Sequence, residues 1–191
     1  MESADITKEA AIEMVPVMQA DGLELLEQLV KNNHCRTFLE IGTAVARTAV
    51  RMAELGLQVT TIERDPEMAQ KARHNIQQSG HAHQITFIQG DAREVELEGS
   101  FDCIFIDAAK AQYEKFFARY SPLLSKDGII VTDNMKFHGL VDHPERTHNR
   151  HTKSLIRHLQ AYRTFLESQS EWVSEFLDDK GDGIALTRRK S

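Results

Sequence analysis

The chain has 191 residues, of which 41% are hydrophobic and 27% are charged, and its net charge at pH 7 is −6. This size and composition are typical of one globular domain, so we expect residues 1–191 to form a single domain that buries a sizeable core. No apolar run reaches the roughly 18–20 residues of a membrane span, the acidic N-terminus is unlike a signal peptide, and two cysteines suit reduced core thiols, so we expect a cytoplasmic protein without a membrane partner.

In chain order, a short helical preface over residues 1–34 precedes alternating strand and helix patterns. Short apolar or β-branched runs predict strands at 36–42, 58–65, 84–91, 101–107 and 127–134. Helical spacing predicts helices at 22–32, 44–56, 66–80, 110–125 and 151–169. Two last runs, EWVSEFLDD and GDGIALTRR, predict strands joined directly at Lys180-Gly181. Strands with helical crossovers favour an α/β, doubly wound (Rossmann-like) seven-stranded sheet, mostly parallel, with one antiparallel strand in a C-terminal hairpin.

Acidic residues lie at the end of every one of the first five predicted strands. They are Glu40 close to Gly42-Thr43-Ala44, then Glu63, Gly90-Asp91-Ala92, Asp107 and Asp133-Asn134. In an open parallel sheet, ligands bind outside the carboxyl ends of the strands. Capping of the following helices explains Asp91 and Asp107 but does not explain the whole set. We therefore expect a ligand site along this edge.

The spacing of two of these acids indicates a nucleoside cofactor. Glu63 lies 23 residues beyond Glu40 at the end of the second strand, where an acidic side chain accepts hydrogen bonds from two ribose hydroxyls. A dinucleotide would need a glycine-rich turn for its pyrophosphate, whereas this turn has only Gly42, and Glu40 beside it would repel phosphate. The pattern favours a cofactor with a ribose, no phosphate and a positive charge, which S-adenosylmethionine satisfies.

Six motifs, FLEIGTA, TIERD, IQGDA, FIDAAK, VTDN and GDGIAL, resemble those of the bacterial O-methyltransferases related to catechol and caffeoyl-coenzyme A O-methyltransferases. The resemblance covers essentially the whole chain. It implies that Asp107, Asp133 and Asn134 hold a divalent metal and that Lys110 is the catalytic base. The cofactor-binding positions that it implies are Met18, Glu40, Gly42, Thr43, Glu63, Asp91, Ala92 and Asp107.

The chemistry of these side chains agrees with the resemblance. Two carboxylates and an amide are hard oxygen ligands, which suit Mg²⁺ or Ca²⁺ better than zinc, and we expect Mg²⁺. Such a metal would chelate two adjacent substrate oxygens and lower the pKa of the one to be methylated. The sequence also departs from the family: Val45, Ala46 and Arg47 stand where a second glycine and an aromatic residue are expected. We therefore expect a looser hold on the methionine part of the cofactor, and the short N-terminal region leaves a homodimer open.

Further features of the sequence bear on which molecule accepts the methyl group. The segment VPVMQADGLELLEQL and a basic stretch resemble the bacterial enzymes that methylate 5-hydroxyuridine at the tRNA wobble position to 5-methoxyuridine. Residues 136–163 hold six Lys or Arg against two Asp or Glu, a local charge of +4, so the rest of the chain carries −10. Phosphate neutralisation supplies much of the affinity for RNA. The tRNA contacts that we expect are Arg146, Arg150, Lys153 and Arg157.

Three alternatives remain open from the residues. A small catechol or hydroxycinnamoyl-type phenol would need an apolar slot near the metal, for which Met135, Phe137 and Trp172 are candidates. A non-catalytic cofactor-binding protein is supported only by the altered turn after Gly42. The basic stretch is also compatible with an ordinary solvated helix face.

Overall fold

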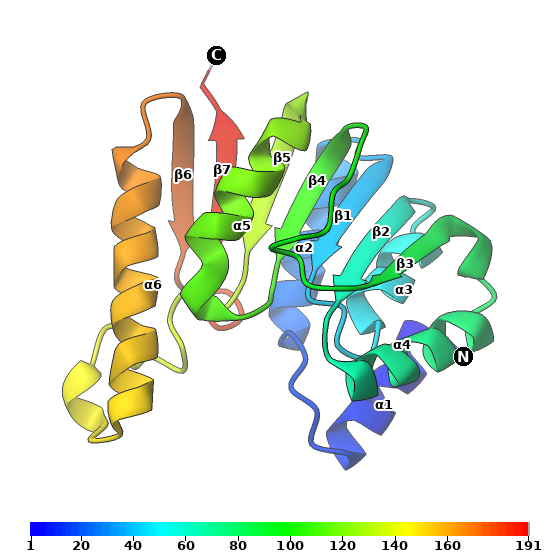
Figure 1. Cartoon of the computed structure of the whole chain (residues 1–191), viewed down its shortest axis with the longest axis horizontal. Helices are drawn as coiled ribbons and strands as arrows, with labels where there is room; N and C mark the ends of the chain where they lie inside the picture. Colours follow the sequence, from blue (N-terminus) through cyan, green and yellow to red (C-terminus); the bar gives the residue numbers. More distant parts are fainter. Residues whose placement is uncertain (191) are drawn as a thin grey trace.

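A seven-stranded sheet with the order β3-β2-β1-β4-β5-β7-β6 forms the centre of the computed structural model, which describes residues 1–190 (Figure 1). The strands are β1 (Thr37–Ile41), β2 (Gln58–Glu63), β3 (Ile85–Gln89), β4 (Phe101–Ile106), β5 (Leu124–Thr132), β6 (Trp172–Leu177) and β7 (Ile184–Arg189). Neighbours among β1 to β5 pair in parallel, and β7 runs antiparallel to both β5 and β6. The predicted fold class, with one antiparallel strand in a C-terminal hairpin, is confirmed.

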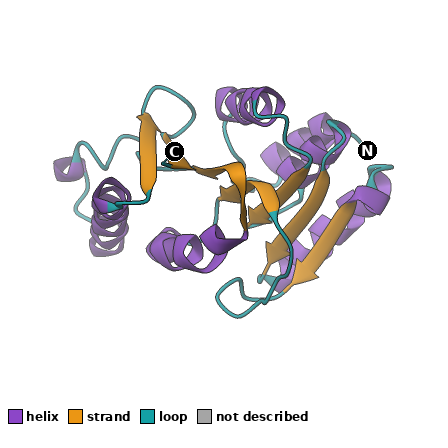
Figure 2. Cartoon of the chain, turned by 90° about the horizontal axis from the view of Figure 1, so that it is seen from above, coloured by secondary structure: helices purple, strands orange, loops and turns teal. Residues whose placement is uncertain are grey.

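Helices cover both faces of the sheet (Figure 2). They are α1 (Ser3–Ile12), α2 (Ala20–Asn32), α3 (Arg47–Glu54), α4 (Pro66–Gln78), α5 (Tyr113–Tyr120) and α6 (Arg150–Ser168), with 3₁₀ turns η1 (Ala82–Gln84), η2 (Lys110–Gln112), η3 (Ser121–Leu123) and η4 (Pro144–Arg146). Residues of α1 to α4 belong to the hydrophobic core on one face, and residues of α5 and α6 belong to the core on the other. Caps fix where two helices begin, because Asp65 and Asn149 each accept two backbone N–H groups at the start of α4 and α6.

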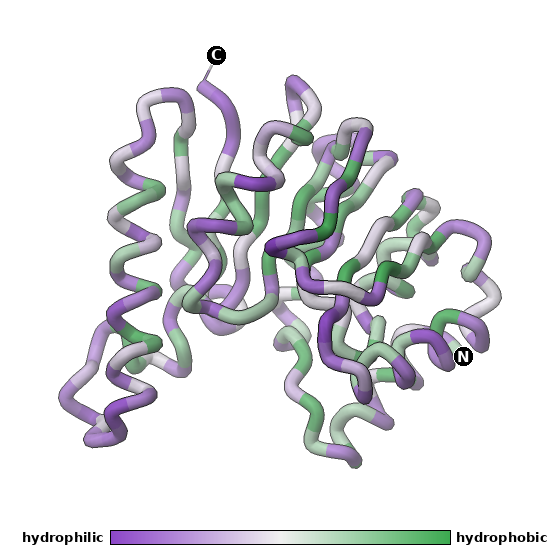
Figure 3. Tube along the Cα trace, viewed as in Figure 1, coloured by the Kyte–Doolittle hydropathy of each residue, from purple (hydrophilic) through white to green (hydrophobic). Residues whose placement is uncertain are grey.

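The central strands are buried on both faces, as is usual for parallel strands covered by helices. In β1, Phe38 packs in one core while Leu39 and Ile41 pack in the other, and all three are 0% exposed. Figure 3 shows the same pattern as hydrophobic strands between helices that alternate hydrophobic and hydrophilic residues. This rigid sheet fixes the position of the loops at its carboxyl edge.

Several predicted boundaries differ from the structure, and three of these differences affect residues at the carboxyl edge of the sheet. The third helix begins at Arg47 instead of residue 44, because Ala44 and Ala46 adopt left-handed φ values of 46° and 66°. The helix predicted over 110–125 is divided into η2, α5 and η3, and Pro122 lies in η3. Strand β5 ends at Thr132, so the Asp133-Asn134 pair belongs to the following loop.

The N-terminal preface packs directly against the sheet's helices. Ser3 donates from its backbone N–H and from its hydroxyl to the Glu54 carboxylate in α3, at 2.7 Å in both cases. Ile6 of α1 and Leu26 of α2 are completely buried in the same core as β1. Helices α1 and α2 are therefore held against the core that also contains Phe38 of β1. Within residues 1–190, no helix combines the length and the apolar character that crossing a membrane requires.

Candidate active site

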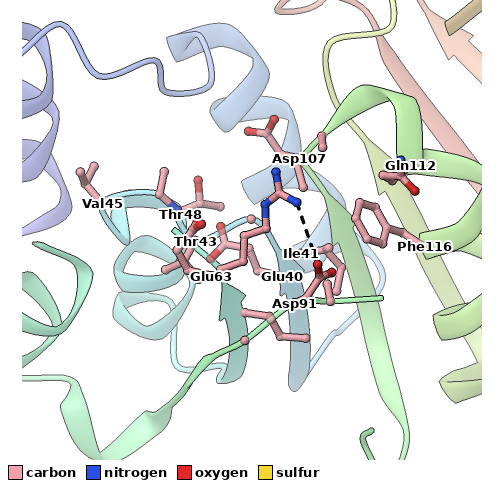
Figure 4. A pocket seen from close by; sticks show the side chains of 18 of the residues that line it. Glu40, Ile41, Thr43, Val45, Thr48, Glu63, Asp91, Asp107, Gln112 and Phe116 are labelled. Atoms are coloured by element: carbon pink, nitrogen blue, oxygen red, sulfur yellow. Dashed lines mark hydrogen bonds and ion pairs between the residues drawn. The ribbon is translucent and has the colours of Figure 1, made fainter. Parts of the chain in front are cut away.

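A pocket of about 240 Å³ lies at the carboxyl ends of β1 to β4. Its wall is formed by the loops that follow these four strands, by the segment before α2, and by the start of α5. Glu40, Glu63, Asp91 and Asp107 bring four carboxyl groups around it (Figure 4). Met18, Gly42, Thr43 and Ala92 also line this pocket, so the structure brings together all eight predicted cofactor-binding residues.

Gly42 allows two strands' loops to approach each other at the floor of the pocket. Its φ is 101°, and a side chain there would place Cβ 2.0 Å from the Asp107 carbonyl oxygen. The Gly42 N–H donates to the Ile62 carbonyl at 3.0 Å, which continues the β1–β2 ladder past the end of the strand. A glycine is therefore required at this position.

Glu63 lies at the end of β2, where the sequence predicts the ribose. Its Oε2 accepts the Ala44 N–H at 2.8 Å, and its Oε1 accepts the Asp65 N–H at 2.8 Å. Each carboxylate oxygen has a further acceptor site, so both remain able to accept a ribose hydroxyl. The two backbone contacts fix the carboxylate before any ligand arrives and tie it to the loop after β1.

Glu40 is only 1% exposed and lies beneath the pocket. Its Oε2 accepts the Thr61 hydroxyl at 2.6 Å, and the Thr61 and Thr43 hydroxyls are 2.5 Å apart. Burial raises the pKa of Glu40 well above its usual value, against the opposing hydrogen bond from Thr61, and the negative charges of Asp107 and Glu63 raise it further. A cation in the pocket would favour the ionised form of Glu40 and lower its pKa again, which agrees with a positively charged cofactor.

Asp91 follows β3 and is already paired. Its carboxylate accepts hydrogen bonds from the side chain and the backbone N–H of Arg93, and these contacts lower its pKa to about 2. Next to it, Ala92 is 7% exposed, and its carbonyl accepts the Tyr120 hydroxyl at 2.7 Å. The loop is therefore held in place, and its contact with the cofactor stays a prediction.

The predicted metal ligands meet at the ends of β4 and β5. The Asn134 amide donates to Asp133 Oδ2 at 2.9 Å and to Asp107 Oδ1 at 3.4 Å. Burial raises the pKa of both carboxyl groups. At Asp133 the negative charge of Asp107 adds to the effect of burial, and the pKa is raised to about 7. Asp133 Oδ1 is buried and has no hydrogen-bond partner among the described residues.

These observations fit a hard divalent cation. A cation would give the buried Asp133 Oδ1 a partner. Its positive charge would also offset the repulsion between the two carboxyl groups. Within residues 1–190, no three His, Cys, Asp or Glu side chains are grouped to hold a metal, so the candidate donor set is two carboxylates and one amide. Tyr113 supports the set from below, because its hydroxyl donates to the Asp133 carbonyl at 3.2 Å.

Lys110 begins η2, three residues after Asp107, and its side chain is half-buried. Its Nζ lies 5.7 Å from the centre of the Phe137 ring. The positive charge of Lys110 favours the ionised forms of Asp107 and Asp133 and opposes the effect of burial on their pKa values. The structure thus places Lys110 beside the candidate metal site, and its role as the base stays a prediction.

Two residues of the site were missed by sequence reasoning. Asp182 is 8% exposed, its Oδ1 accepts the His138 N–H, and its charge raises the pKa of Asp133. The signal was its place in the GDGIAL motif. Arg47 lines the cofactor pocket and is 6% exposed, whereas the sequence marked it only as a departure from the family's pattern and gave it no binding role.

Part of the proposed phenol slot is wrong. Trp172 begins β6 at the amino edge of the sheet and packs against Phe117 and Arg189, so it lies at the edge opposite the site. Met135 is 2% exposed and also packs in that core. Phe137 is the candidate that remains, because it lies beside Lys110.

The predicted tRNA contacts do not line the pocket. Arg146, in η4, and Arg150, Lys153 and Arg157, on the first two turns of α6, are all exposed. In Figure 1 the segment before α6 extends at the end of the sheet to which β1 and β4 point. They belong to a segment at the carboxyl edge of the sheet and are separate from the cofactor pocket, and their contact with RNA stays a prediction.

The fold, the acidic strand ends and the pocket define an S-adenosylmethionine-dependent methyltransferase. Comparisons with known proteins agree: a model of the O-methyltransferase family matches residues 2–190, and the chain belongs to that family. Catechol O-methyltransferase from Niastella koreensis is 33% identical over 139 residues, which span 66% of this chain and 61% of that protein.

Solved structures show the same relationship. A candidate caffeoyl-CoA O-methyltransferase from Staphylococcus aureus is 33% identical, with a TM-score of 0.94 over 100% of this chain and 93% of that one. The O-methyltransferase TomG from Streptomyces achromogenes, solved with S-adenosylmethionine, shares the fold at 20% identity, with a TM-score of 0.81 over 99% of this chain and 89% of that one.

Proposed function

We propose that this O-methyltransferase transfers the methyl group of S-adenosylmethionine to one of two adjacent oxygens of a small phenol of the catechol type, with the help of Mg²⁺. The observation that carries the proposal is the group formed by Asp107, Asp133 and Asn134, with the unpartnered Asp133 Oδ1 beside the cofactor pocket. The names of the relatives, which include a catechol and a candidate caffeoyl-CoA O-methyltransferase, support an acceptor of this class.

The residues divide the work by position. Glu63 binds the ribose hydroxyls, and Glu40 places a buried acidic group under the cationic part of the cofactor. Asp107, Asp133 and Asn134 would hold the metal, which when bound would lower the pKa of the acceptor's hydroxyl. Lys110, in its neutral form, would take the proton from that hydroxyl at Nζ. The half-buried Phe137 ring packs against the acceptor's aromatic ring.

An alanine substitution at Asp133 tests the proposal. Asp133→Ala removes a metal ligand that does not line the cofactor pocket, so turnover of a catechol should fall by at least about 100-fold, as is usual when positioning of the reacting groups is lost. The dissociation constant of S-adenosylhomocysteine, measured by calorimetry, should stay within about 2-fold of the wild-type value. This is much less than a tenfold change, which corresponds to about 1.4 kcal/mol. Asp127→Ala, at the exposed start of β5, is the matched control and should change neither quantity. Full activity of Asp133→Ala would exclude this metal site.

A tRNA acceptor is the second candidate, and one observation favours it. Arg150, Lys153 and Arg157 follow one another at intervals of three and four residues, so they share one face of α6. Within the part of the chain that the structure describes, none of the three forms an ion pair. Arg150 also lies in the first turn of α6, where the helix dipole disfavours a cation. An exposed row of unpaired cations suits contact with phosphates.

A further inference from the structure

Arg47 is a buried cation in the wall of the cofactor pocket. It occupies the first position of α3 and is 6% exposed. Its Nη1 donates to the Met18 carbonyl at 2.6 Å, and its Nε donates to the Thr7 hydroxyl at 2.7 Å. Both acceptors are uncharged and belong to the N-terminal preface, so they satisfy hydrogen bonds of the guanidinium without neutralising its charge.

No acid in the described residues neutralises Arg47. Glu27 is the acid whose charge acts on it, but the Glu27 carboxylate is taken by Arg51, whose Nε and Nη2 donate to it at 2.7 and 2.9 Å. Burial lowers the pKa of Arg47, so its surroundings disfavour the charge. An arginine stays protonated in a protein even so, and a buried charge without a counter-ion costs stability.

The other cations of this pocket are already paired. Arg93 and Arg64 both lie near the Asp91 carboxylate, Arg93 in direct contact and Arg64 at 3.9 Å. Among the described residues that line the pocket, Arg47 is thus the cation without an acidic partner. Met18 and Thr48 line the same pocket, and Met18 belongs to the segment before α2.

We propose that Arg47 binds the α-carboxylate of the cofactor's methionine. S-adenosylmethionine carries one anionic group, and the pocket offers one unpaired cation. With the ribose at Glu63, the methionine extends along the loop after β1, toward Thr43, Thr48 and Arg47. A bound carboxylate gives the buried guanidinium its counter-ion in a charge-assisted hydrogen bond. This inference rests on S-adenosylmethionine binding in the pocket, and it assigns to Arg47 the hold on the methionine that the sequence left in doubt.

Ligands that differ only in the carboxylate separate this role from a structural one. Calorimetry would measure the dissociation constants of S-adenosylhomocysteine and of its decarboxylated analogue, which keeps the adenosine, the thioether and the amine. The wild-type protein should bind S-adenosylhomocysteine about 10- to 100-fold more tightly than the analogue, as expected for a charged hydrogen bond. Arg47→Met should lose that preference by weakening S-adenosylhomocysteine alone, and Arg47→Lys should keep part of it.

Thr7→Val is the matched control, because it removes a hydrogen bond of the same guanidinium and leaves its charge. It should change the affinity for both ligands equally and leave their ratio intact. Equal weakening of both ligands in Arg47→Met, or no preference for the carboxylate in the wild-type protein, would overturn the proposal; the latter comparison needs no variant to fold. Absence of binding by both ligands to the wild-type protein would instead contradict the cofactor site itself.

Discussion

Asp133 is 1% exposed, and one of its carboxylate oxygens has no partner within the described chain. Its other oxygen accepts the Asn134 amide, and Asp107, whose pKa is also raised by burial, lies on the far side of that amide. An arrangement of this kind is costly when both acids are ionised, because each charge is buried and the two repel each other. A bound cation would offset the repulsion and the cost of burying both charges, so the three side chains suit a metal site.

The protein's stability should therefore depend on pH in a way that the metal changes. The pKa of Asp133 is about 7 in the folded metal-free chain, against about 3.9 in an unfolded chain. Between these values the folded state holds more protons, so the free energy of unfolding should fall as pH rises from about 4 to about 7. Saturating Mg²⁺ should weaken or reverse that fall, because it favours the ionised pair.

Urea unfolding at a series of pH values, with EDTA or with Mg²⁺, measures this effect. Asp133→Asn is the control, since it keeps the shape of the side chain and removes its titration, so its pH slope in EDTA should be smaller than that of the wild-type protein. Identical slopes for the two proteins in EDTA would show that Asp133 does not titrate as described.

At the scale of elements, the ends of the strands could be predicted and the details of the loops could not. Alternating strand and helix patterns place Glu63, Asp107 and Asp133 at one edge of a parallel sheet, because the topology leaves no other arrangement. The pocket position of Arg47 depends on two residues with left-handed φ, Ala44 and Ala46, and on a contact with α1. Neither the strained loop nor that long-range contact has a signature in the sequence.

Substitutions on the exposed face of α6 distinguish a tRNA acceptor from a small phenol. If tRNA is the substrate, Arg150→Ser/Arg157→Ser should weaken tRNA binding and flatten its log–log salt dependence by about two units, one for each lost phosphate contact. Methylation of a catechol should be unaffected, because neither residue lines the pocket. Filter binding of hydroxyuridine-containing tRNA across a salt series, with a parallel catechol assay, gives both quantities.

Arg36→Ser/Lys126→Ser is the matched control for this face. It removes the same charge from exposed positions at the amino edge of the sheet, before β1 and early in β5. A nucleic-acid surface on α6 requires that this control keep the wild-type salt slope. Equal salt slopes of tRNA binding in the wild-type protein, the α6 variant and this control would show that the α6 cations do not contact tRNA.

At the scale of the whole molecule, the architecture follows from patterns that sequence reasoning handles well. Parallel strands buried on both faces appear as continuous apolar runs, and the missing helix before β7 forces the hairpin. Apolar side chains of the site are harder to predict, because apolar character alone does not distinguish a core side chain from a pocket wall. Trp172, a sequence candidate for the phenol slot, begins β6 at the opposite edge of the sheet. The acceptor depends on such side chains, so it follows less directly from the sequence than the fold does.

The central claim is that a divalent metal at Asp107, Asp133 and Asn134 selects an acceptor with two adjacent oxygens. The most direct measurement is the initial rate of methyl transfer from S-adenosylmethionine to 1,2-dihydroxybenzene, compared with phenol, in Mg²⁺ and in EDTA. We expect rapid transfer only to the dihydroxy compound and only with Mg²⁺, with activity restored when Mg²⁺ is returned after EDTA. Transfer to the dihydroxy compound at the same rate in EDTA, or equal rates for the two acceptors in Mg²⁺, would contradict the account.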